Sequence, residues 1–435
     1  MQFHYLSKSW INKFRSSLLL KNSVISLVFQ VIPITIAIIF IPINILHLGL
    51  ELWGLYSLAI TLFFLVMYLN FGIGPSVNRL VSEYRSKMNF VSEKNLVHTS
   101  FFISLLLCFL LYIFFKILDE TIVYFIFSES DFTKYESGIR ELFNYIYIGS
   151  CIYLQINFFR NVIEGQQLFL FVSFTRAIFA SFLIISPLLT SKELINFSGL
   201  YINILLSIII SLYFIIFIKD YGFPNIKKFS NIQFKKIIYQ GSLISLHSFF
   251  NPIFIFLDRY VISSLLGLFF VGIYTSFYDI ISRLTIISSS ISSALFPSAS
   301  SNIENKSKLK DSVFFSLFLT SILTAIPTII LLIYGPQIIS IWLKQDYPIE
   351  YSYLIRILCS AYFIQGLNLV LLKTMQATKN FKFPVYLSLV LSIFYVPSLF
   401  FSIKFFGITG AGLIFLIKNI IEFCLSIIFF KRRIV

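Results

Sequence analysis

Four charged residues interrupt the apolar second half of this sequence at positions that a helical hairpin would bring together. Asp258 and Arg259 lie eleven and ten residues before Phe269, where a short turn joins two apolar segments. Asp279 lies ten residues after Phe269, and Arg283 follows one helical turn later. A hairpin folded at this turn places Asp258, Arg259 and Asp279 at one depth, roughly 15 Å from the turn, because a helix rises about 1.5 Å per residue.

Ionisable groups inside apolar helices are costly in lipid, so we expect these four residues to face the protein interior or water. The default interpretation of Asp258, Arg259, Asp279 and Arg283 is therefore a functional site. The alternative is that the four residues form two ion pairs that only join the two helices.

Two more cations lie in apolar segments, each one helical turn before an acid. Arg160 precedes Glu164 and Lys418 precedes Glu422, which predicts ion pairs along each helix. Arg160 could form part of a substrate entry site at the cytoplasmic side, but its place near a span end favours snorkelling to the interface. Lys418 is deeper, so either a role in a cavity or a simple pair would explain it. Both remain candidate substrate-binding residues.

The composition indicates that membrane helices position these charges. Of the 435 residues, 58% are hydrophobic and 12% are charged, and the mean hydropathy is +0.88. The net charge of +15 does not indicate nucleic acid, because the basic residues lie in short segments between apolar spans. The four cysteines and four histidines lack the spacing of a metal site, and we expect no metal and no cofactor.

The apolar segments predict the topology. A bilayer core takes about 20 residues of helix, and lysine and arginine are about three times as frequent on one side when both termini are cytoplasmic. We therefore predict an all-α membrane protein with twelve transmembrane helices. The predicted spans are 24–47, 53–78, 97–118, 140–163, 168–190, 197–218, 239–266, 271–297, 312–335, 352–376, 382–403 and 409–430.

Two connections between these spans stand out. The third, at about 119–139, carries five acids and is predicted to be a solvated outer loop. The sixth, 219–238, is basic and lies at mid-chain, so we expect a cytoplasmic linker there. It would separate an N-terminal six-helix bundle, 1–218, from a C-terminal six-helix bundle, 239–435.

An internal repeat supports two halves. The motif Gly49-Leu50-x-x-x-Gly54-x-Tyr56 recurs as Gly267-Leu268-x-x-x-Gly272-x-Tyr274. Six spans return the chain to its starting side, so the bundles would be parallel repeats around a central cavity. The repeat aligns position 279 with Thr61 and position 283 with Leu65, so the charge cluster belongs to the second half alone.

These motifs resemble those of a known family. The sequence is similar to the polysaccharide flippases, the Wzx-type branch of the multidrug/oligosaccharidyl-lipid/polysaccharide exporter superfamily. The resemblance is carried by Gly54, Leu55, Tyr56, the break at Asn70–Gly74, Arg79, Leu257-Asp258-Arg259, Gly267, Gly272, Tyr274, Asp279, Arg283, Phe296-Pro297 and the run Gly407–Gly412.

The resemblance implies a V-shaped transporter of the MATE type in the bacterial cytoplasmic membrane. Its substrate would be an undecaprenyl-pyrophosphate-linked oligosaccharide, an O-antigen or capsule repeat unit, moved from the inner to the outer leaflet by alternating access. With such a substrate, Arg259 and Arg283 would bind the headgroup phosphate, because the forked N–H donors of a guanidinium suit phosphate oxygens. Asp258 and Asp279 would hold or release these arginines, and Arg160 could receive the anionic headgroup at the cytoplasmic side. Membrane lipids would surround it, and a polysaccharide polymerase and glycosyltransferases are the enzymes that could accompany it. No nucleic acid partner is expected.

Three other classes of membrane protein are alternatives. A cation-coupled drug or metabolite antiporter of the same superfamily would carry buried acids in its first two spans, and this sequence has none there. A membrane polysaccharide polymerase or glycosyltransferase would carry a large loop or soluble domain with catalytic acids, which the short connections do not provide. A lipid II-type flippase usually has more spans. We therefore expect a transporter and not an enzyme.

Overall fold

The computed structural model describes residues 18–68, 72–189, 198–217, 221–222, 225–301, 306–344, 348, 350–378, 380 and 382–434. The regular structure of this described part is helical throughout. The N-terminal half contains α2 (Leu18–Leu48), α3 (Leu50–Tyr68), α4 (Ile73–Ser86), α5 (Phe90–Ile117), α6 (Asp119–Ile126), α7 (Glu129–Gly165), α8 (Phe169–Ile185) and α9 (Ser198–Phe217). The C-terminal half contains α10 (Asn231–Leu266), α11 (Leu268–Ile281), α12 (Thr285–Ser301), α13 (Lys306–Leu343), α14 (Glu350–Ala377), α15 (Lys382–Phe406) and α16 (Ile408–Phe429).

The all-α membrane fold is confirmed. Each predicted span coincides with one of these helices or with two consecutive ones, and eight helical stretches are long and apolar enough to cross a bilayer. Two shorter apolar stretches, Leu50–Leu65 and Leu200–Leu212, belong to α3 and α9. The count of twelve crossings stays a prediction.

The second predicted span, 53–78, is not one continuous helix. Helix α3 ends at Tyr68 and α4 begins at Ile73. Gly72, directly before α4, lies in the left-handed region at φ 66°. Ser76 closes the first turn of α4, because both its backbone N–H and its hydroxyl donate to the carbonyl of Gly72, at 3.1 and 2.8 Å. Pro75 has no backbone N–H, but it lies in this first turn, where the N–H groups of a helix have no carbonyl partner within the helix.

The chain divides into two compact units whose limits cut across individual helices. The first unit consists of Met1–Leu48, Leu62–Asp119 and Ser137–Ser245, and the second of Gly49–Thr61, Glu120–Glu136 and Leu246–Val435. The second unit therefore includes the start of α3 and the segment that joins α6 to α7. The domain limits 1–218 and 239–435 stay a prediction.

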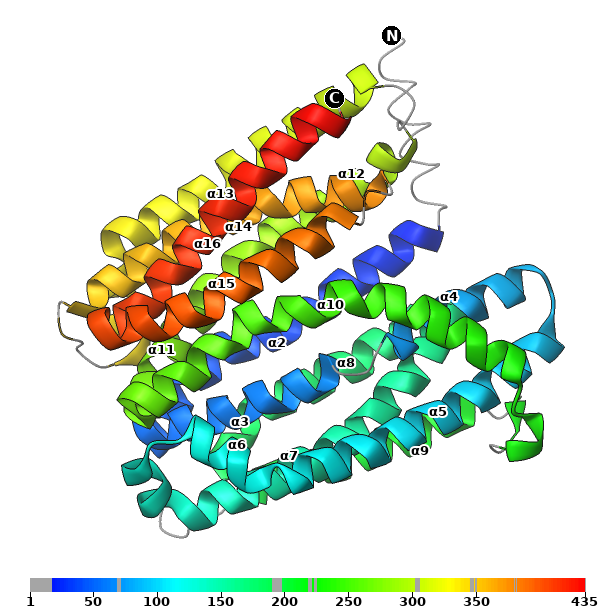
Figure 1. Cartoon of the computed structure of the whole chain (residues 1–435), viewed down its shortest axis with the longest axis horizontal. Helices are drawn as coiled ribbons and strands as arrows, with labels where there is room; N and C mark the ends of the chain where they lie inside the picture. Colours follow the sequence, from blue (N-terminus) through cyan, green and yellow to red (C-terminus); the bar gives the residue numbers. More distant parts are fainter. Residues whose placement is uncertain are drawn as a thin grey trace. The chain divides into compact units, whose positions relative to one another are not determined.

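Five helices of the second unit form a bundle. α14 packs against α12, α13 and α16, and α15 packs against α16 (yellow to red in Figure 1). Apolar side chains fill the space at one end of this bundle, where Ala299, Val313, Val370 and Met375 are each 0% exposed. Close packing of this kind gives a rigid frame for the charged residues of the same unit.

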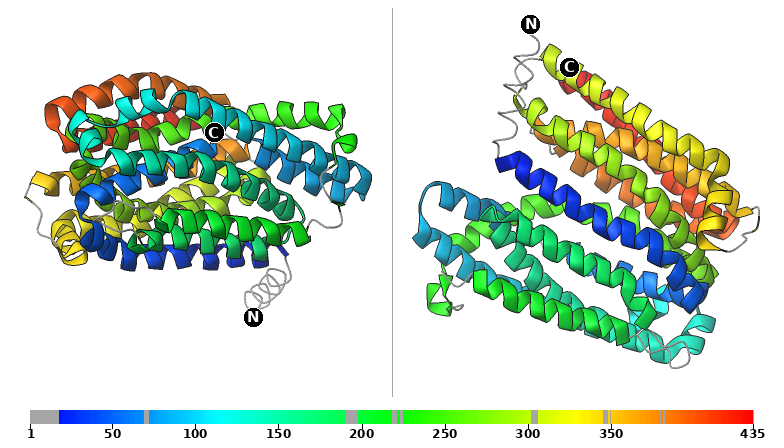
Figure 2. Two further views of the ribbon diagram at one scale, coloured as in Figure 1. Left: turned by 90° about the horizontal axis from the view of Figure 1, so that it is seen from below. Right: turned by 180° about the vertical axis from the view of Figure 1, so that it is seen from behind.

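The first unit has an aromatic centre. α2 packs against α8, and α4 and α5 form a hairpin, drawn in blue in Figure 2. The ring of Phe63 contacts those of Tyr145, Tyr153 and Phe179, with centroids 6.0, 5.5 and 6.2 Å away. These contacts tie α3, α7 and α8 together, since aromatic pairs at such distances attract one another.

The acidic connection at about 119–139, predicted to be a solvated surface, is helical, and Glu120, Glu129 and Glu136 are exposed. This segment forms α6 and the first turns of α7, and its side chains bind other parts of the chain. The carboxylate of Asp119 accepts a hydrogen bond from Tyr147 at 2.7 Å, and that of Asp131 accepts one from the backbone N–H of Leu268 at 3.0 Å. Acidic composition alone does not show such partners, because they are distant in sequence.

Candidate functional site

The hairpin of α10 and α11 turns at Gly267. Its φ of 95° is a conformation that side chains with a Cβ rarely adopt, so glycine is needed for so tight a turn. The N–H of Gly267 donates to the carbonyls of Ile262 and Ser263, which closes the end of α10, and α11 starts at the next residue. The turn fixes how the charged residues of the two helices meet.

The two copies of the repeat lie against each other within the second unit. A Cβ on Gly54 would lie 2.1 Å from the carbonyl oxygen of Leu268, and a Cβ on Gly272 would lie 2.1 Å from that of Leu50. One turn further on, the hydroxyls of Ser57 and Thr275 are 3.2 Å apart. This reciprocal contact, which we call the glycine crossing, brings the starts of α3 and α11 as close as two helix backbones can come.

Arg259 lies one turn deeper than this crossing. Its Nη1 donates to the hydroxyl of Thr61 at 2.7 Å, and its Nη2 donates to Oδ1 of Asp279 at 3.4 Å. The guanidinium carbon lies 4.8 Å from the centroid of the Tyr278 ring, which is a cation–π distance. The predicted meeting of Arg259 with Asp279 across the hairpin is confirmed, while Thr61 was not recognised from the sequence as a partner.

Asp258 is fully buried and forms no direct ion pair with a described residue, although the charge of the neighbouring Arg259 acts on it. Its Oδ1 accepts the backbone N–H of Arg259 at 2.8 Å, and its Oδ2 accepts the hydroxyl of Tyr274. The alternative of two ion pairs is therefore wrong in detail. One ion pair, Arg259 with Asp279, joins α10 to α11, and a tyrosine satisfies the other acid.

Arg283 lies apart from this pair. A short 3₁₀ turn, Ser282–Leu284, interrupts the predicted continuous span and carries Arg283, which is half-buried. Its guanidinium forms no ion pair and no hydrogen bond with any residue that the structure describes. Its charge acts on Asp279 without a direct contact between the two side chains.

Lys418 and Glu422 form the predicted pair on α16. Their Nζ and Oε2 atoms are 2.7 Å apart, and both side chains are less than a tenth exposed. Lys418 also donates to Asn419 at 3.2 Å and lies 4.5 Å from the centroid of the Phe254 ring on α10. A buried ion pair needs such extra contacts, because removing two charges from water is costly.

The predicted pair of Arg160 with Glu164 is wrong. Glu164 binds Arg176 of α8 at 2.7 Å and Asn78 of α4 at 3.0 Å. Arg160 instead turns inward, is 4% exposed, and donates from Nη1 to the hydroxyl of Tyr153 at 3.2 Å. Snorkelling to an interface, which the sequence favoured for Arg160, does not describe this buried position.

Two buried guanidinium groups keep donors that nothing in the described part of the chain accepts. These are Nε and Nη2 of Arg160 in the first unit, and Nε of Arg259 in the second. A buried donor without a partner costs about 1–3 kcal/mol, and more on a charged group. Such groups are suited to an acceptor that arrives from outside the protein, such as water or an anion.

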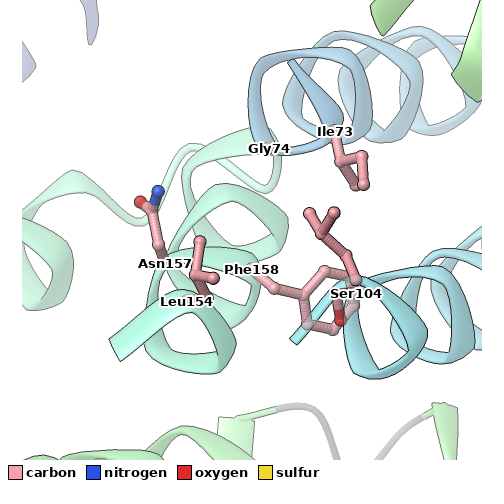
Figure 3. A pocket seen from close by; sticks show the side chains of 7 residues that line it. Ile73, Gly74, Ser104, Leu154, Asn157 and Phe158 are labelled. Carbon is pink, nitrogen blue, oxygen red and sulfur yellow. The ribbon is translucent and has the colours of Figure 1, made fainter. Parts of the chain in front are cut away.

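Two cavities lie away from these charged residues. One, in the first unit, has room for about one water molecule at about 20 Å³ and lies between Ile73 and Gly74 of α4, Ser104 of α5 and Leu154 and Phe158 of α7 (Figure 3). The other, of about 230 Å³, lies in the second unit between the end of α13 and the start of α14, beside Arg356. The central cavity expected from the repeat stays a prediction.

Comparison with known proteins identifies the family. The family described as polysaccharide biosynthesis protein matches residues 19–303, which is more than half of the chain. The chain belongs to this family. The MatE family also matches, over residues 244–401. The resemblance found in the sequence is therefore confirmed.

One curated relative of this polysaccharide biosynthesis family member is a putative O-antigen transporter of Shigella flexneri. It is 25% identical over 418 residues, which cover 93% of this chain and 96% of that protein. Among solved structures, an inward-facing MATE family multidrug resistance transporter of the MOP superfamily matches with a TM-score of 0.76. It is 14% identical, and the match covers 94% of this chain and 98% of the other.

The lipid II flippase MurJ, in an inward closed conformation, matches with a TM-score of 0.72 and 16% identity, over 95% of this chain and 88% of that one. These likenesses establish a MATE-like helical membrane fold. The alternative of a membrane enzyme is set aside, because the curated relative and the proteins that share this fold are transporters and flippases.

Proposed function

We propose that this protein flips a lipid-linked oligosaccharide with a phosphorylated headgroup, of the undecaprenyl-pyrophosphate class, from the inner to the outer leaflet of the bacterial cytoplasmic membrane. The oligosaccharide would be the repeat unit of an O-antigen or capsule. Both termini would be cytoplasmic, and transport would proceed by alternating access. Family membership and the resemblance to a putative O-antigen transporter support a role in polysaccharide export.

The observation that carries the proposal is the pair of buried arginines with unused donors. A pyrophosphate cannot cross hydrocarbon without groups that replace its water. Arg160 offers Nε and Nη2, and Arg259 offers Nε, and phosphate oxygens accept from such donors in charge-assisted hydrogen bonds. Arg160 lies in the first unit and Arg259 in the second.

The other candidates differ in their partners. Arg283 is half-buried and has no ion pair or hydrogen bond with a described residue, so the headgroup would not have to displace such a partner there. Arg259 and Lys418 are held by Asp279 and Glu422. The acids would keep these cations in place when no substrate is bound, and the phosphate would compete with them when it arrives. Asp258 would act through Tyr274 and the backbone of Arg259 as a positioning residue.

One observation favours the alternative, a cation-coupled antiporter. Asp258 is a fully buried acid whose described partners are a tyrosine hydroxyl and a backbone N–H, so a proton or another cation could neutralise it. An antiporter of cationic drugs would protect cells from these compounds. Measuring drug resistance in cells with and without the gene separates this function from polysaccharide export.

The proposed function is tested by replacing the two arginines in cells that depend on this gene for surface polysaccharide. Arg160→Met and Arg259→Met should each abolish surface polysaccharide and leave the lipid-linked repeat unit in the inner leaflet, with normal amounts of protein in the membrane. Arg356→Met is the matched control, because Arg356 is exposed and lies by a separate cavity. Normal polysaccharide in both test variants would refute the proposal.

A further inference from the structure

The segment Ser128–Tyr135, between α6 and the body of α7, touches the start of both repeat helices. Asp131 accepts from the backbone N–H of Leu268, at the start of α11, at 3.0 Å. Lys134 donates to Glu51, in the first turn of α3, at 2.5 Å, and the Tyr135 hydroxyl donates to the same carboxylate oxygen. We call this segment the strap, since one short piece of chain is bound to two turns that are far apart in sequence.

The strap is itself ordered by local bonds. The Ser128 hydroxyl donates to Asp131 Oδ2 at 2.9 Å, and the N–H of Asp131 donates back to that hydroxyl at 3.2 Å. The carboxylate is thus aimed at the N-terminus of α11, where a negative charge is favoured by the helix dipole. Gly267 leaves room for it, because a Cβ there would lie 3.1 Å from Asp131 Oδ2.

The limits of the strap coincide with a limit between the compact units. Tyr135 has non-helical backbone angles of φ −123° and ψ 23°, which kink α7. This segment of the second unit ends one residue later, at Glu136, and the body of α7 belongs to the first unit. α3 changes unit in the same way after Thr61. The strap and the start of α3 are therefore parts of the second unit that continue directly into the first.

We propose that the strap is a latch that holds the glycine crossing of α3 and α11 shut and releases it during the transport cycle. The strap is bound to both turns that begin the crossing helices, and the crossing is the closest approach of those helices that the structure describes. A closed latch therefore keeps the starts of α3 and α11 together, with Ser57 beside Thr275. An open latch allows them to separate.

The strength of the latch suits a reversible step. The Lys134–Glu51 pair is partly exposed, at 56% and 38%, and exposed ion pairs contribute little to stability. The hydrogen bond from Leu268 to the Asp131 carboxylate is charge-assisted and therefore stronger than one between neutral groups. Contacts this few are weak enough for a ligand to shift the equilibrium between a closed and an open latch. Release of the latch during transport rests on the proposed function, while the closing of the crossing does not.

The experiment measures how often the crossing is closed. Ser57→Cys and Thr275→Cys are introduced together into the full chain, with the four native cysteines replaced by serine, and this background is first shown to export polysaccharide. The hydroxyls of Ser57 and Thr275 are 3.2 Å apart, so the paired cysteines are within reach of a disulfide. The rate of disulfide formation with copper phenanthroline is followed in purified protein by the loss of reaction with a maleimide of high mass.

Two variants open the latch independently. Asp131→Asn weakens the bond to α11 without changing the size of the side chain, and Glu51→Gln removes the charge that binds Lys134 on α3. Each should lower the rate of disulfide formation at least threefold. Glu129→Gln is the matched control, because Glu129 lies in the same strap and its carboxylate has no partner among the described residues. Equal rates in Asp131→Asn, Glu51→Gln and Glu129→Gln would overturn the latch.

The release step has its own readout. Cells with the Ser57→Cys and Thr275→Cys pair should lose export when the disulfide forms and regain it when a reductant breaks it. Export that continues in the oxidised cells would overturn release of the latch, and the proposed function would stand. If the proposed function is wrong, export will be absent in the reduced protein as well as in the oxidised one. The rate of disulfide formation will then be unchanged.

Discussion

Thr61 and Asp279 are 218 residues apart, occupy equivalent positions in the two copies of the repeat, and both bind the guanidinium of Arg259. The same alignment pairs Gly54 with Gly272 and Ser57 with Thr275, and each of these pairs is also in contact. The contacts therefore form three layers along the two helices, starting at the turns: the pair of glycines, the pair of hydroxyls, and Arg259 with its two partners. In the first two layers the two repeats contribute similar residues. In the third they do not, since only the second half supplies the acid and the base.

Weakening either of the two bonds to Arg259 should destabilise the second unit. Asp279→Asn leaves a buried guanidinium without its counter-ion and should lower the free energy of unfolding by about 1–3 kcal/mol. Thr61→Val leaves Nη1 of the same guanidinium without its acceptor and should also cost about 1–3 kcal/mol. Both are measured as a fall in the melting temperature of the purified protein in detergent. Asp311→Asn, at an exposed site on α13, is the control and should leave it unchanged.

The glycine crossing should not accept a methyl group. Alanine at position 54 or 272 would place its Cβ 2.1 Å from a backbone carbonyl, so α3 and α11 must separate. Gly54→Ala and Gly272→Ala should each cost about 1–3 kcal/mol, the usual range for overpacking. Gly149→Ala serves as the comparison, because its Cβ would meet the ring of Tyr145 at an ordinary 3.4 Å. Equal melting temperatures for the three variants would contradict the close approach.

The pair on α16 should behave as one unit. Lys418→Met leaves Glu422 buried without its partner and should cost about 3–5 kcal/mol, whereas the double variant Lys418→Met with Glu422→Leu should recover most of this loss. A double-mutant cycle on chemical denaturation measures the coupling. Strictly additive losses would show that the two side chains do not depend on each other.

The latch should weaken in acid. Glu51 lies before the predicted span, and hydrogen bonds from Lys134 and Tyr135 hold its pKa below the usual range. A carboxylate with a lowered pKa in the folded state stabilises that state above its unfolded pKa, and the stabilisation is lost as the pH falls through the lowered value. The melting temperature of the purified protein in detergent should therefore fall as the pH drops below the ordinary pKa of glutamate. In Glu51→Gln this fall should be smaller, and an identical fall would assign it to other groups.

The sequence predicted the parts of the site that depend on spacing along one hairpin. The distances of Asp258, Arg259 and Asp279 from the turn gave their common depth, because the rise of a helix is constant. The repeat motif also predicted two equivalent turns, and the structure has glycines of positive φ at both, Gly49 and Gly267. Patterns of this kind are local and can be read from a single chain.

The contacts that were missed or wrong depend on other helices. Glu164 was predicted to bind Arg160 on the same helix, but Arg176 of α8 reaches it, and Arg160 then turns to Tyr153. Thr61 looks like an ordinary residue of an apolar helix, although the repeat aligns it with Asp279. Comparing each charged residue in an apolar helix with the residue at the aligned position of the other repeat would have identified Thr61. The partners of the strap, by contrast, have no such signal.

The most direct test of the account is flipping by the purified protein in vesicles. Its substrate is an undecaprenyl-pyrophosphate-linked oligosaccharide, followed by the accessibility of its sugar to an added lectin. The account predicts that the wild-type protein moves this lipid between leaflets, and that a variant with both Arg160→Met and Arg259→Met moves it at least tenfold more slowly while remaining folded. Equal rates for the two proteins would contradict the claim that buried arginines carry the phosphorylated headgroup.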